Sequence, residues 1–595
     1  MTEISKDGTI NIGGWQDGIG QSVLDNFSDM LGVNINDNPG SVSANFKFNK
    51  VIENISPQTF TVITDRVVTP SSIIYRGAED LIAVTLTTTG TLPTGLAINT
   101  TYYLIKTAVN TYKLQTTLKG SGYASITAGT GSGVHTITPI TPGRITGYTK
   151  NSQGRGFYLD HIGRVWFGGI EQLYLLEGNT LAGSEGNGII YYKGYILVFR
   201  NAYISALKEI QATNETLTWT NDFVTKQSSF DNNHPFLSIN DDSIYFGDGI
   251  PTAGGYYQVS MLEEVVGKTF NPTDASTFDY AVGVVTLPNE NGNGMATSIN
   301  EMSQYLVIGT NSNKIFFWDK KSPSFTSFVT LQESGVNSVE IIGNTGYAFV
   351  GINGYMYIFD TVSSSRVKVV PEQISNQYYG NLSISFTASS SYQKELLFAV
   401  KIGVNCYLMS YNIETKKLVK KNISSFGESL TSSSVVSLSQ NGYISYILVN
   451  SDNIVIGSSY HSLVTDSFNY AVESLLYRPS LSSGNETYYV YDNYEPNIIT
   501  GLISYGDVYN KRTVKELSIV FTRPLEVSQG VRLSYRRDDF SAFTALKTID
   551  YATFGAIKEL KVPAPITDIV DLQIKIEFDG LNLTSPRIKT VRLIP

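Results

Sequence analysis

The chain has 595 residues, enough for several hydrophobic cores, and charged residues make up only 16% of it, against about 25% in an average soluble protein. The formal net charge is −9, with +3 in residues 501–595 (14 basic, 11 acidic) and −12 in the other 500 residues (29 basic, 41 acidic). A chain this acidic is not expected to grip a nucleic acid backbone over a broad surface.

The single cysteine, Cys406, excludes an intrachain disulfide and a thiolate metal cage. The start MTEISKDGTINIGGW lacks the basic and apolar regions of a signal peptide, and no segment approaches the roughly 18 apolar residues of a membrane span. We therefore expect a soluble protein that is made in a cytoplasm and folds by packing alone.

Residues 1–56 are expected to form an irregular N-terminal arm that packs on a larger unit. Within the arm, SVLDNFSDMLGV (22–33) is a candidate short helix that Ser22 can cap. Its apolar residues recur at helical spacing, at Leu24, Phe27, Met30 and Leu31.

Residues 57–141 are predicted to form a small inserted β domain. Between residues 81 and 140 there are no acids, and Thr occupies 16 of 60 positions. The segment VTLTTTGTLPTGLAINTTYYLIKTAVNTYKLQ alternates strand and turn patterns, with LPTG and AVNT as turns.

Residues 142–470 contain seven stretches that share a hairpin-like pattern. They are GRVWFGG (163–169), GYILVFR (194–200), DSIYFGDG (242–249), YLVIGTNSNKIFFWD (305–319), GYAFVGINGYMYIFD (346–360), ELLFAVKIGVNCYLMSYN (395–412) and YISYILVNSDNIVIGSS (443–459). Their starts are 31, 48, 63, 41, 49 and 48 residues apart. Because a four-stranded propeller blade takes about 40–50 residues, a β-propeller of six or seven blades is predicted. The widest interval contains TFNPTDASTFDYAVGVVTLPNENGNG, which we expect to be a long loop or a further strand pair.

The repeat pattern fades toward residue 470, and residues 471–496 are expected to be a linker. Residues 497–595 contain strands of period two with outward Arg and Lys, which predicts a C-terminal β-sandwich. The fold class is thus expected to be all-β: an N-terminal arm, an inserted small β domain, a six- to seven-bladed β-propeller and a C-terminal β-sandwich.

No residue pattern in the sequence indicates catalysis. The four histidines, His135, His161, His234 and His461, lie far apart and in no zinc-type spacing, although a Ser-His-Asp triad needs no proximity in sequence. Paired carboxylates at strand ends, a nucleophile elbow and a cofactor loop do not stand out. We expect no enzyme activity, no catalytic, cofactor-binding or metal-binding residues, and no cofactor.

Four short stretches carry partial motifs. LDHIGRVWF (159–167) has the Asp, Gly and Trp of sialidase Asp-box turns without the Ser and the spacing, which favours a hairpin turn with a buried Trp166. NENGNG (289–294) and SINDD (238–242) offer oxygen ligands for Ca²⁺ but match no calcium loop, so turns are favoured. GTGSGVHT (129–136) lacks the Lys of a phosphate loop and precedes a strand.

Two charged stretches are expected at the surface. KKLVKK (416–421) places lysines on both sides of a strand, as a solvated edge strand does. YRRDD (535–539) is predicted to be a surface turn, with a subunit interface as the alternative.

Two stretches resemble proteins of tailed bacteriophages. Residues 13–42, with Trp15, Met30, Val33, Asn34 and Pro39-Gly40, resemble the opening of tail proteins that carry a propeller. Residues 84–137 are similar to a small β module that recurs in phage virion proteins. The residues that carry this second likeness are LPTGL (92–96), Tyr102, Tyr103, Gly131, Gly133, His135 and Thr136. The nearest family is tail tubular protein B, or nozzle, of short-tailed phages, and more loosely their tail hub and DNA-stabilisation proteins.

The resemblance implies a structural virion protein of the tail. Such proteins form a ring, typically a homohexamer, below the portal and adaptor, extend the DNA channel, retain the packaged genome and release it on infection. The implied partners are further copies of the chain, portal-adaptor or other tail proteins, tail fibres, and genomic DNA that passes without sequence-specific contact. The chain is shorter than better-known nozzles, so their fibre-docking and gating residues do not carry over.

Three other readings stay open. The chain could be a receptor- or glycan-binding tail protein whose propeller faces and inserted module present aromatic side chains to sugars. A glycan depolymerase would instead place two carboxylates about 5–10 Å apart at the propeller centre. A cellular propeller unrelated to phages is the last alternative.

Overall fold

The structure is a computed structural model of the chain. It describes residues 2–4, 9–13, 27–31, 33–34, 41–44, 49–53, 56–73, 81–118, 122–169, 173–176, 185–210, 217–226, 234–248, 257–288, 294–370, 384–403, 405–423, 440–449, 453–462, 467–476, 496–505, 511–537, 542–579 and 585–595.

The regular secondary structure of the described residues is almost entirely β-sheet, antiparallel except for the pairing of β3 with β36, which confirms the all-β prediction. The helix α2 (Tyr551–Phe554) has only four residues, and Asp550 caps it by accepting from the Thr553 amide. In the part of the chain that the structure describes, no helix is long and apolar enough to cross a membrane.

Seven sets of four paired strands, called sheets below, follow one another along the middle of the chain; six are separate four-stranded sheets, and the sixth in order forms one end of a ten-stranded sheet. The first three contain β13 (Ile145–Lys150), β14 (Gly156–Asp160), β15 (Val165–Gly168) and β16 (Leu173–Leu175); β17 (Gly186–Tyr192), β18 (Tyr195–Arg200), β19 (Tyr203–Lys208) and β20 (Trp219–Thr225); and β21 (Phe236–Leu237), β22 (Ile244–Gly247), β23 (Tyr257–Glu264) and β24 (Phe278–Leu287). The fourth and fifth contain β25 (Ala296–Met302), β26 (Tyr305–Thr310), β27 (Lys314–Trp318) and β28 (Ser327–Thr330); and β29 (Val336–Ile342), β30 (Thr345–Val350), β31 (Tyr355–Phe359) and β32 (Ser364–Lys368). The sixth contains β33 (Ile384–Tyr392), β34 (Glu395–Ile402), β35 (Asn405–Asn412) and β36 (Lys417–Ile423), and the seventh contains β37 (Gln440–Val449), β38 (Asn453–Ser462), β39 (Ser467–Leu476) and β6 (Asn49–Glu53).

Each of the seven hairpin-like stretches lies in a different one of these sheets. The second strands are the most apolar because sheets cover them on both faces; β18 and β30, for example, are buried at every position after the first. The segment TFNPTDASTFDYAVGVVTLPNENGNG, expected to be a long loop or a strand pair, contains one long strand where the structure describes it, β24, which is the fourth strand of the third sheet.

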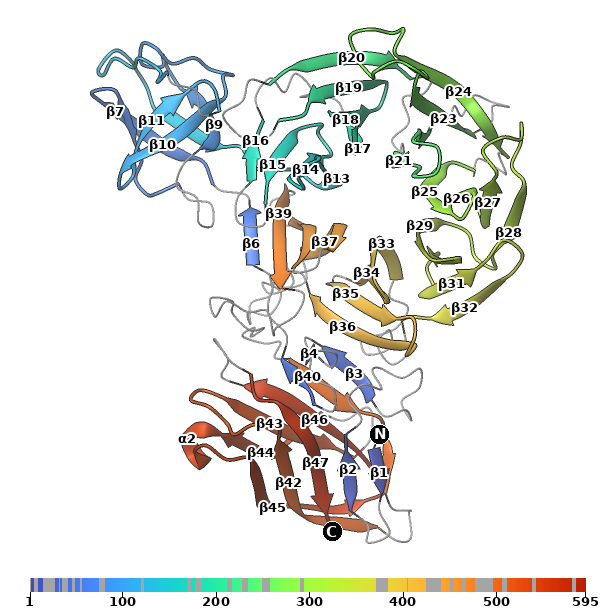
Figure 1. Cartoon of the computed structure of the whole chain (residues 1–595). Coiled ribbons are helices and arrows are strands. Elements are labelled where there is room, and N and C mark those ends of the chain that lie inside the picture. The colour runs from blue at the N-terminus through green and yellow to red at the C-terminus, as the bar shows by residue number, and fades with distance from the viewer. Residues whose placement is uncertain are drawn as a thin grey trace.

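The seven sheets are arranged around a common centre (Figure 1). Glycines allow neighbouring sheets to approach closely, since a Cβ on Gly147 of β13 would lie 3.0 Å from Ile189 of β17. A Cβ on Gly457 of β38 would lie 2.8 Å from the Cβ of Ile145 in β13. This second contact brings the seventh sheet against the first.

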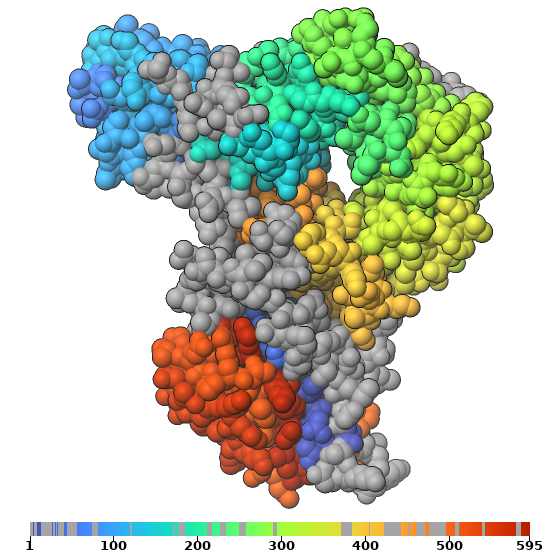
Figure 2. All heavy atoms as spheres, in the orientation of Figure 1, coloured from blue at the N-terminus to red at the C-terminus, as the bar shows by residue number. Residues whose placement is uncertain are grey.

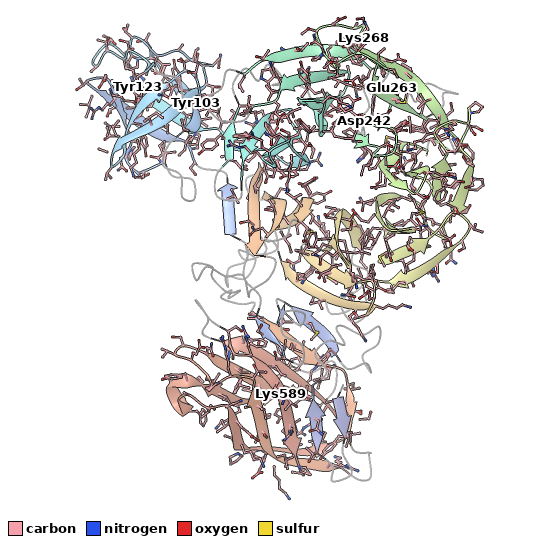
Figure 3. All side chains as sticks on the ribbon, in the orientation of Figure 1. Tyr103, Tyr123, Asp242, Glu263, Lys268 and Lys589 are labelled. Atoms are coloured by element: carbon pink, nitrogen blue, oxygen red, sulfur yellow. The ribbon has the colours of Figure 1, made fainter. Side chains whose placement is uncertain are left out.

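A closed six-stranded barrel lies between β6 and β13, within the range predicted for the inserted domain. Its order is β10 (Tyr102–Ala108), β11 (Thr111–Gln115), β8 (Arg66–Val68), β7 (Gln58–Ile63), β12 (His135–Pro139) and β9 (Ile82–Thr88). The barrel is attached to the first sheet by the Tyr103 hydroxyl, which donates to the Leu175 carbonyl at 3.1 Å (Figure 3).

The C-terminal unit consists of two sheets. One has the order β1 (Thr2–Ile4), β2 (Ile10–Ile12), β47 (Ile588–Ile594), β42 (Arg512–Phe521) and β45 (Glu559–Ile569). The other has β3 (Phe27–Leu31), β40 (Asn497–Thr500), β46 (Asp571–Asp579), β43 (Gly530–Arg536) and β44 (Thr544–Asp550), with β41 (Ile503–Ser504) paired to β46; it continues the sixth sheet, because β3 also pairs with β36. A short pair, β4 (Val33–Asn34) and β5 (Ser43–Ala44), lies beside them.

The N-terminal arm is therefore not a separate irregular segment. Strands β1, β2 and β3 complete the C-terminal unit, and β6 completes the seventh sheet. The expected linker also begins too early, since residues 471–476 belong to β39; residues 477–495 lie outside the described part of the chain.

The predicted helix over 22–33 is wrong where the structure describes it. Phe27–Leu31 is the strand β3, paired with β40 on one side and β36 on the other. A β-bulge between Phe27 and Asp29 turns both Phe27 and Met30 inward, which imitates the three-residue spacing of a helix. Ser22, Leu24, Trp15 and Pro39-Gly40 lie outside the described residues.

The prediction of a solvated edge for KKLVKK is also wrong. Strand β36 is paired on both sides, and Lys420 and Lys421 are 1% and 7% exposed. The Lys421 ammonium pairs with Glu395 at 3.1 Å, and that of Lys420 lies 5.0 Å from the ring centre of Tyr407. Partners on neighbouring strands thus make the buried charges tolerable.

Candidate functional site

The first strands of six of the seven sheets, together with His234 just before the third, line a central pocket of about 410 Å³. Figure 2 shows an opening at the centre of the sheets. The pocket is lined by Arg144, Ile145, Thr146 and His161 of the first sheet; Glu185, Gly186 and Asn187 of the second; His234 before the third; Thr297, Val336 and Asn337 of the fourth and fifth; and Thr387, Tyr443 and Ser445 of the sixth and seventh.

Polar groups at this centre tie neighbouring sheets together. The Gly186 amide donates to the His161 carbonyl at 3.0 Å, between the second and first sheets. The Thr297 hydroxyl donates to the Val336 carbonyl at 2.6 Å, between the fourth and fifth. These hydrogen bonds hold neighbouring sheets together beside the pocket.

Asp160 organises the turn beside the pocket. Its fully buried carboxylate accepts from the Gly143 amide at 3.0 Å, from the Arg164 amide and Nε at 2.9 Å each, and from the Trp166 Nε1 at 3.1 Å. This confirms the predicted hairpin turn with a buried Trp166, which is 1% exposed. The carboxylate has the role of a structural acceptor, because four donors occupy it.

The structure brings two of the four histidines, His161 and His234, to the pocket. The Arg144 amide donates to Nδ1 of His161 at 2.9 Å, and burial lowers the pKa of His161, so the neutral imidazole is favoured. His135 lies in the barrel, and His461 lies on β38. Since strand topology alone joins His161 to His234, no local sequence pattern could have paired them.

Glu340 of β29, on the first strand of the fifth sheet, contacts the sixth sheet. The Ser389 hydroxyl of β33 donates to its carboxylate at 2.6 Å. Burial nevertheless raises the pKa of Glu340 above its usual value, since desolvation outweighs this hydrogen bond. The group is a pH-sensitive contact between two sheets.

The candidate calcium ligands are engaged with protein donors where the structure describes them. In SINDD, Asp241 accepts from the Tyr245 hydroxyl at 2.7 Å, Asp242 pairs with Lys193, and Asn240 donates to the Ser303 carbonyl at 2.7 Å. Residues 289–293 of NENGNG lie outside the described residues. Over the described ranges, no group of three or more His, Cys, Asp or Glu side chains is placed to hold a metal ion.

The stretch YRRDD begins at the end of β43. Arg536 donates from Nε to the Gln573 side chain at 2.7 Å, and its guanidinium lies 4.6 Å from the ring centre of Phe543. Asp538 and Asp539 lie outside the described residues.

No family model matches the chain, and no curated protein matches its sequence. Solved structures similar to part of it include the computationally designed Ika8 protein, with a TM-score of 0.34 and 12% identity over 56% of this chain and 96% of that one. Raptor from Chaetomium thermophilum has a TM-score of 0.38 and 8% identity over 56% of this chain and 28% of its own length. Similarity this low carries no argument about function.

Proposed function

We propose that the seven sheets form a closed seven-bladed β-propeller and that the chain is a structural subunit of a bacteriophage tail. It would build a nozzle-type ring, a homohexamer, that extends the DNA channel below the portal and adaptor. The observation that carries the proposal is the continuous sheet that joins the sixth blade to the C-terminal unit through β3.

Closure of the propeller is supported at the junction of the seventh and first sheets. Gly457 of β38 packs against Ile145 of β13, and one central pocket takes residues from six of the seven sheets and from His234 just before the third. The N-terminal strand β6 supplies the fourth strand of the seventh sheet, so the two ends of the circular arrangement are linked through hydrogen bonds.

We infer that the shared sheet stiffens the connection between the seven sheets and the C-terminal unit. Leu31 of β3 pairs with Lys420 of β36 on one side and with Asn497 of β40 on the other. A subunit that lines a pressurised channel needs such stiffness, because a hinge inside each subunit would let the channel change shape. A ligand-binding protein has no comparable need.

The charge of the chain fits a channel through which DNA moves. At −9 the subunit repels the phosphate backbone over most of its surface, which disfavours tight binding of the passing genome. We propose as partners further copies of the chain, portal-adaptor proteins and tail fibres, and as location the virion tail.

The proposal is tested on the full-length protein. We expect light scattering after size-exclusion chromatography to give the mass of a hexamer, electron microscopy to show a ring with a central channel, and antibodies to label the virion tail next to the portal. A protein that stays monomeric with purified portal-adaptor complex and is absent from virions would overturn the assignment. Deletion of residues 497–595 would not test the C-terminal unit alone, because it also removes β47 and β40, the strands that pair with β2 and β3.

Assembly through the C-terminal unit can be tested with surface charges. Lys561 of β45 and Arg592 of β47 are exposed and both pair in register with Ser518 of β42. If this basic row contacts a neighbouring subunit, reversing both charges to Glu will shift the mass from hexamer toward monomer without changing the thermal unfolding of the monomer. An unchanged hexamer would exclude this face as the contact.

A further inference from the structure

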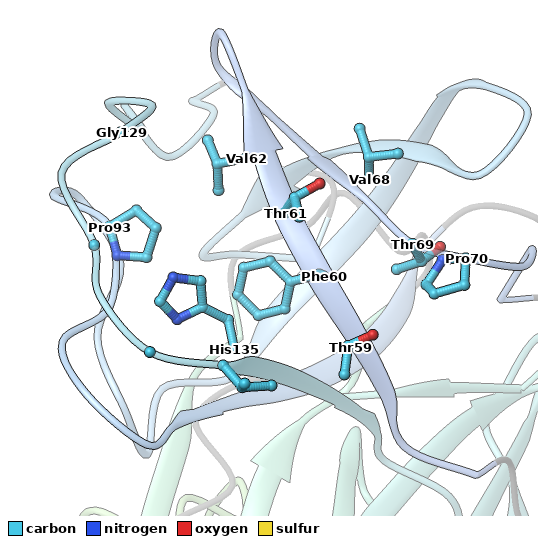
Figure 4. Close-up of a pocket in the computed structure, with 13 residues that line it drawn as sticks. Thr59, Phe60, Thr61, Val62, Val68, Thr69, Pro70, Pro93, Gly129 and His135 are labelled. Atoms are coloured by element: carbon cyan, nitrogen blue, oxygen red, sulfur yellow. The ribbon is translucent and has the colours of Figure 1, made fainter.

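The inserted barrel has a pocket of about 660 Å³ at the end where the chain leaves β9 and enters β12 (Figure 4). Its lining residues are Thr59, Phe60, Thr61, Val62, Val68, Thr69, Pro70, Pro93, Gly129, Gly131, Gly133, Val134 and His135. This volume lies within the range of about 300–1,000 Å³ that is typical of small-molecule sites, and barrel mouths are common places for them.

Among the barrel residues that the structure describes, no charged side chain lines the pocket. Phosphates and carboxylates bind where Arg, Lys or a helix N-terminus neutralises them, and metal cations bind where carboxylates gather. The lining instead combines threonine hydroxyls, the backbone of a glycine-rich loop and apolar side chains. It therefore fits a neutral ligand that carries hydroxyl groups.

His135 gives the pocket a fixed planar wall. Its imidazole lies between Pro93 and Phe60 in Figure 4, and the ring centres of His135 and Phe60 are 5.4 Å apart. Nδ1 contacts the Thr88 hydroxyl at 2.9 Å, which sets the orientation of the ring. Thr59 and Thr61 point to the other side of their strand from His135 in Figure 4, so their hydroxyls and the half-buried imidazole line neighbouring parts of the pocket, and a saccharide that spans both parts can hydrogen-bond to them.

The rim of the pocket is held in place before any ligand arrives. Thr91 and Ser132 exchange two backbone hydrogen bonds of 3.0 and 2.9 Å, and the Thr130 hydroxyl accepts from the Thr94 amide at 2.8 Å. A Cβ on Gly131 would lie 2.9 Å from Nε2 of His135, so a glycine is needed for the loop to pass there. Such preorganisation lowers the entropic cost of binding.

We propose that this barrel mouth is a binding site for a neutral saccharide of one to a few sugar units. The site goes beyond a channel role, since it would let a tail subunit contact uncharged glycans on a host surface. The GTGSGVHT stretch supplies the loop and His135, and it serves as the rim of a sugar site and not as a phosphate loop.

The test uses the full-length protein with neutral mono- to trisaccharides of glucose, galactose, mannose and N-acetylglucosamine, and with sialyllactose and a heparin disaccharide as charged comparisons. We expect saturation-transfer NMR and calorimetry to detect at least one neutral saccharide and neither charged one. Thr61→Trp places a large side chain over the pocket and is expected to weaken binding about tenfold or more. His135→Phe keeps the ring and removes its nitrogens, with a loss of about tenfold from one or two hydrogen bonds.

Thr107→Trp is the matched control, an exposed threonine on strand β10 that does not line the pocket, and it should bind as the unaltered protein does. Absence of binding by every neutral saccharide, preference for a charged one, or equal binding by the Thr61 and Thr107 variants would each overturn the proposal. Hexamer formation is measured on the same samples, so failure of the sugar site is distinguishable from failure of the ring assignment.

Discussion

Replacement of Asp160 by Ala is expected to destabilise the β14–β15 hairpin of the first sheet. The change leaves the Arg164 guanidinium, which is 18% exposed, without its carboxylate partner and leaves the buried Trp166 Nε1 and the Gly143 amide without an acceptor. Removing one partner of a buried ion pair costs about 3–5 kcal/mol. Because every 1.4 kcal/mol is a factor of ten, opening of the β14–β15 hairpin should become roughly 10²–10³ times more frequent.

Hydrogen exchange measured by mass spectrometry is the suitable assay, because a chain with several units need not unfold in one step. Amides of β14 and β15 should exchange roughly 10²–10³ times faster in the variant, while those of the C-terminal unit keep their rates. Asp360→Ala is the control, since Asp360 accepts from two turn amides in the same way but is exposed, so only its own turn should respond. Unchanged protection of β14 and β15 in the Asp160 variant would refute the anchoring role.

Other buried contacts give three more expectations. Glu395→Gln and Lys421→Met are each expected to destabilise the sixth sheet by about 3–5 kcal/mol, and the double variant by less than the sum, in a double-mutant cycle followed by thermal unfolding. Glu340→Gln should raise the melting temperature at about pH 8 and lose this advantage near pH 4.5. The pKa of Glu340 is raised in the folded protein, so its contribution to the free energy of unfolding is complete below its ordinary pKa of 4.5 and is lost as the pH rises through the pKa of the folded state. Gly457→Ala forces a Cβ against Ile145 and is expected to cost about 1–3 kcal/mol, with partial rescue by Ile145→Val, read as shifts in melting temperature.

The controls for these variants lie in the same sheets or at comparable positions. Gly169→Ala adds a Cβ that meets nothing within 4 Å, so its melting temperature should equal that of the unaltered protein. Additive effects of the Glu395 and Lys421 changes would mean that the pair does not interact. A Glu340→Gln variant with the same pH profile as the unaltered protein would show that Glu340 does not titrate on unfolding.

Sequence patterns could predict the repeated sheets because their middle strands leave a strong local signal. Strands such as β18 and β30 are covered on both faces, so selection for burial acts on five consecutive positions and produces the apolar stretches found at each repeat. The hairpin turn at Asp160 was predictable for a similar reason, since Gly163 adopts a φ of +84° that glycine accepts readily. Both signals are contained in a few neighbouring residues.

The features that the sequence did not reveal depend on partners that are distant along the chain. Lys421 looks like a solvated edge residue until Glu395 is placed beside it on a neighbouring part of the sheet. The segment Phe27–Leu31 looks helical because a bulge alters its strand periodicity, and its pairing partners β36 and β40 lie hundreds of residues away. The central pocket collects residues from six sheets and the segment before the third, so none of its members has a local signature.

The N-terminal strands make closure of the two large units interdependent. Strand β6 pairs with β39 in the seventh sheet, and β2 pairs with β47, the last strand of the C-terminal unit. Both pairings join the first residues of the chain to some of the last, so loop-closure entropy places them late in folding. Only about 40 residues separate β2 from β6, and β3 between them bridges β36 and β40. A shift of either unit would therefore displace the strand that completes the other, so we expect the seven sheets and the C-terminal unit to move as one body.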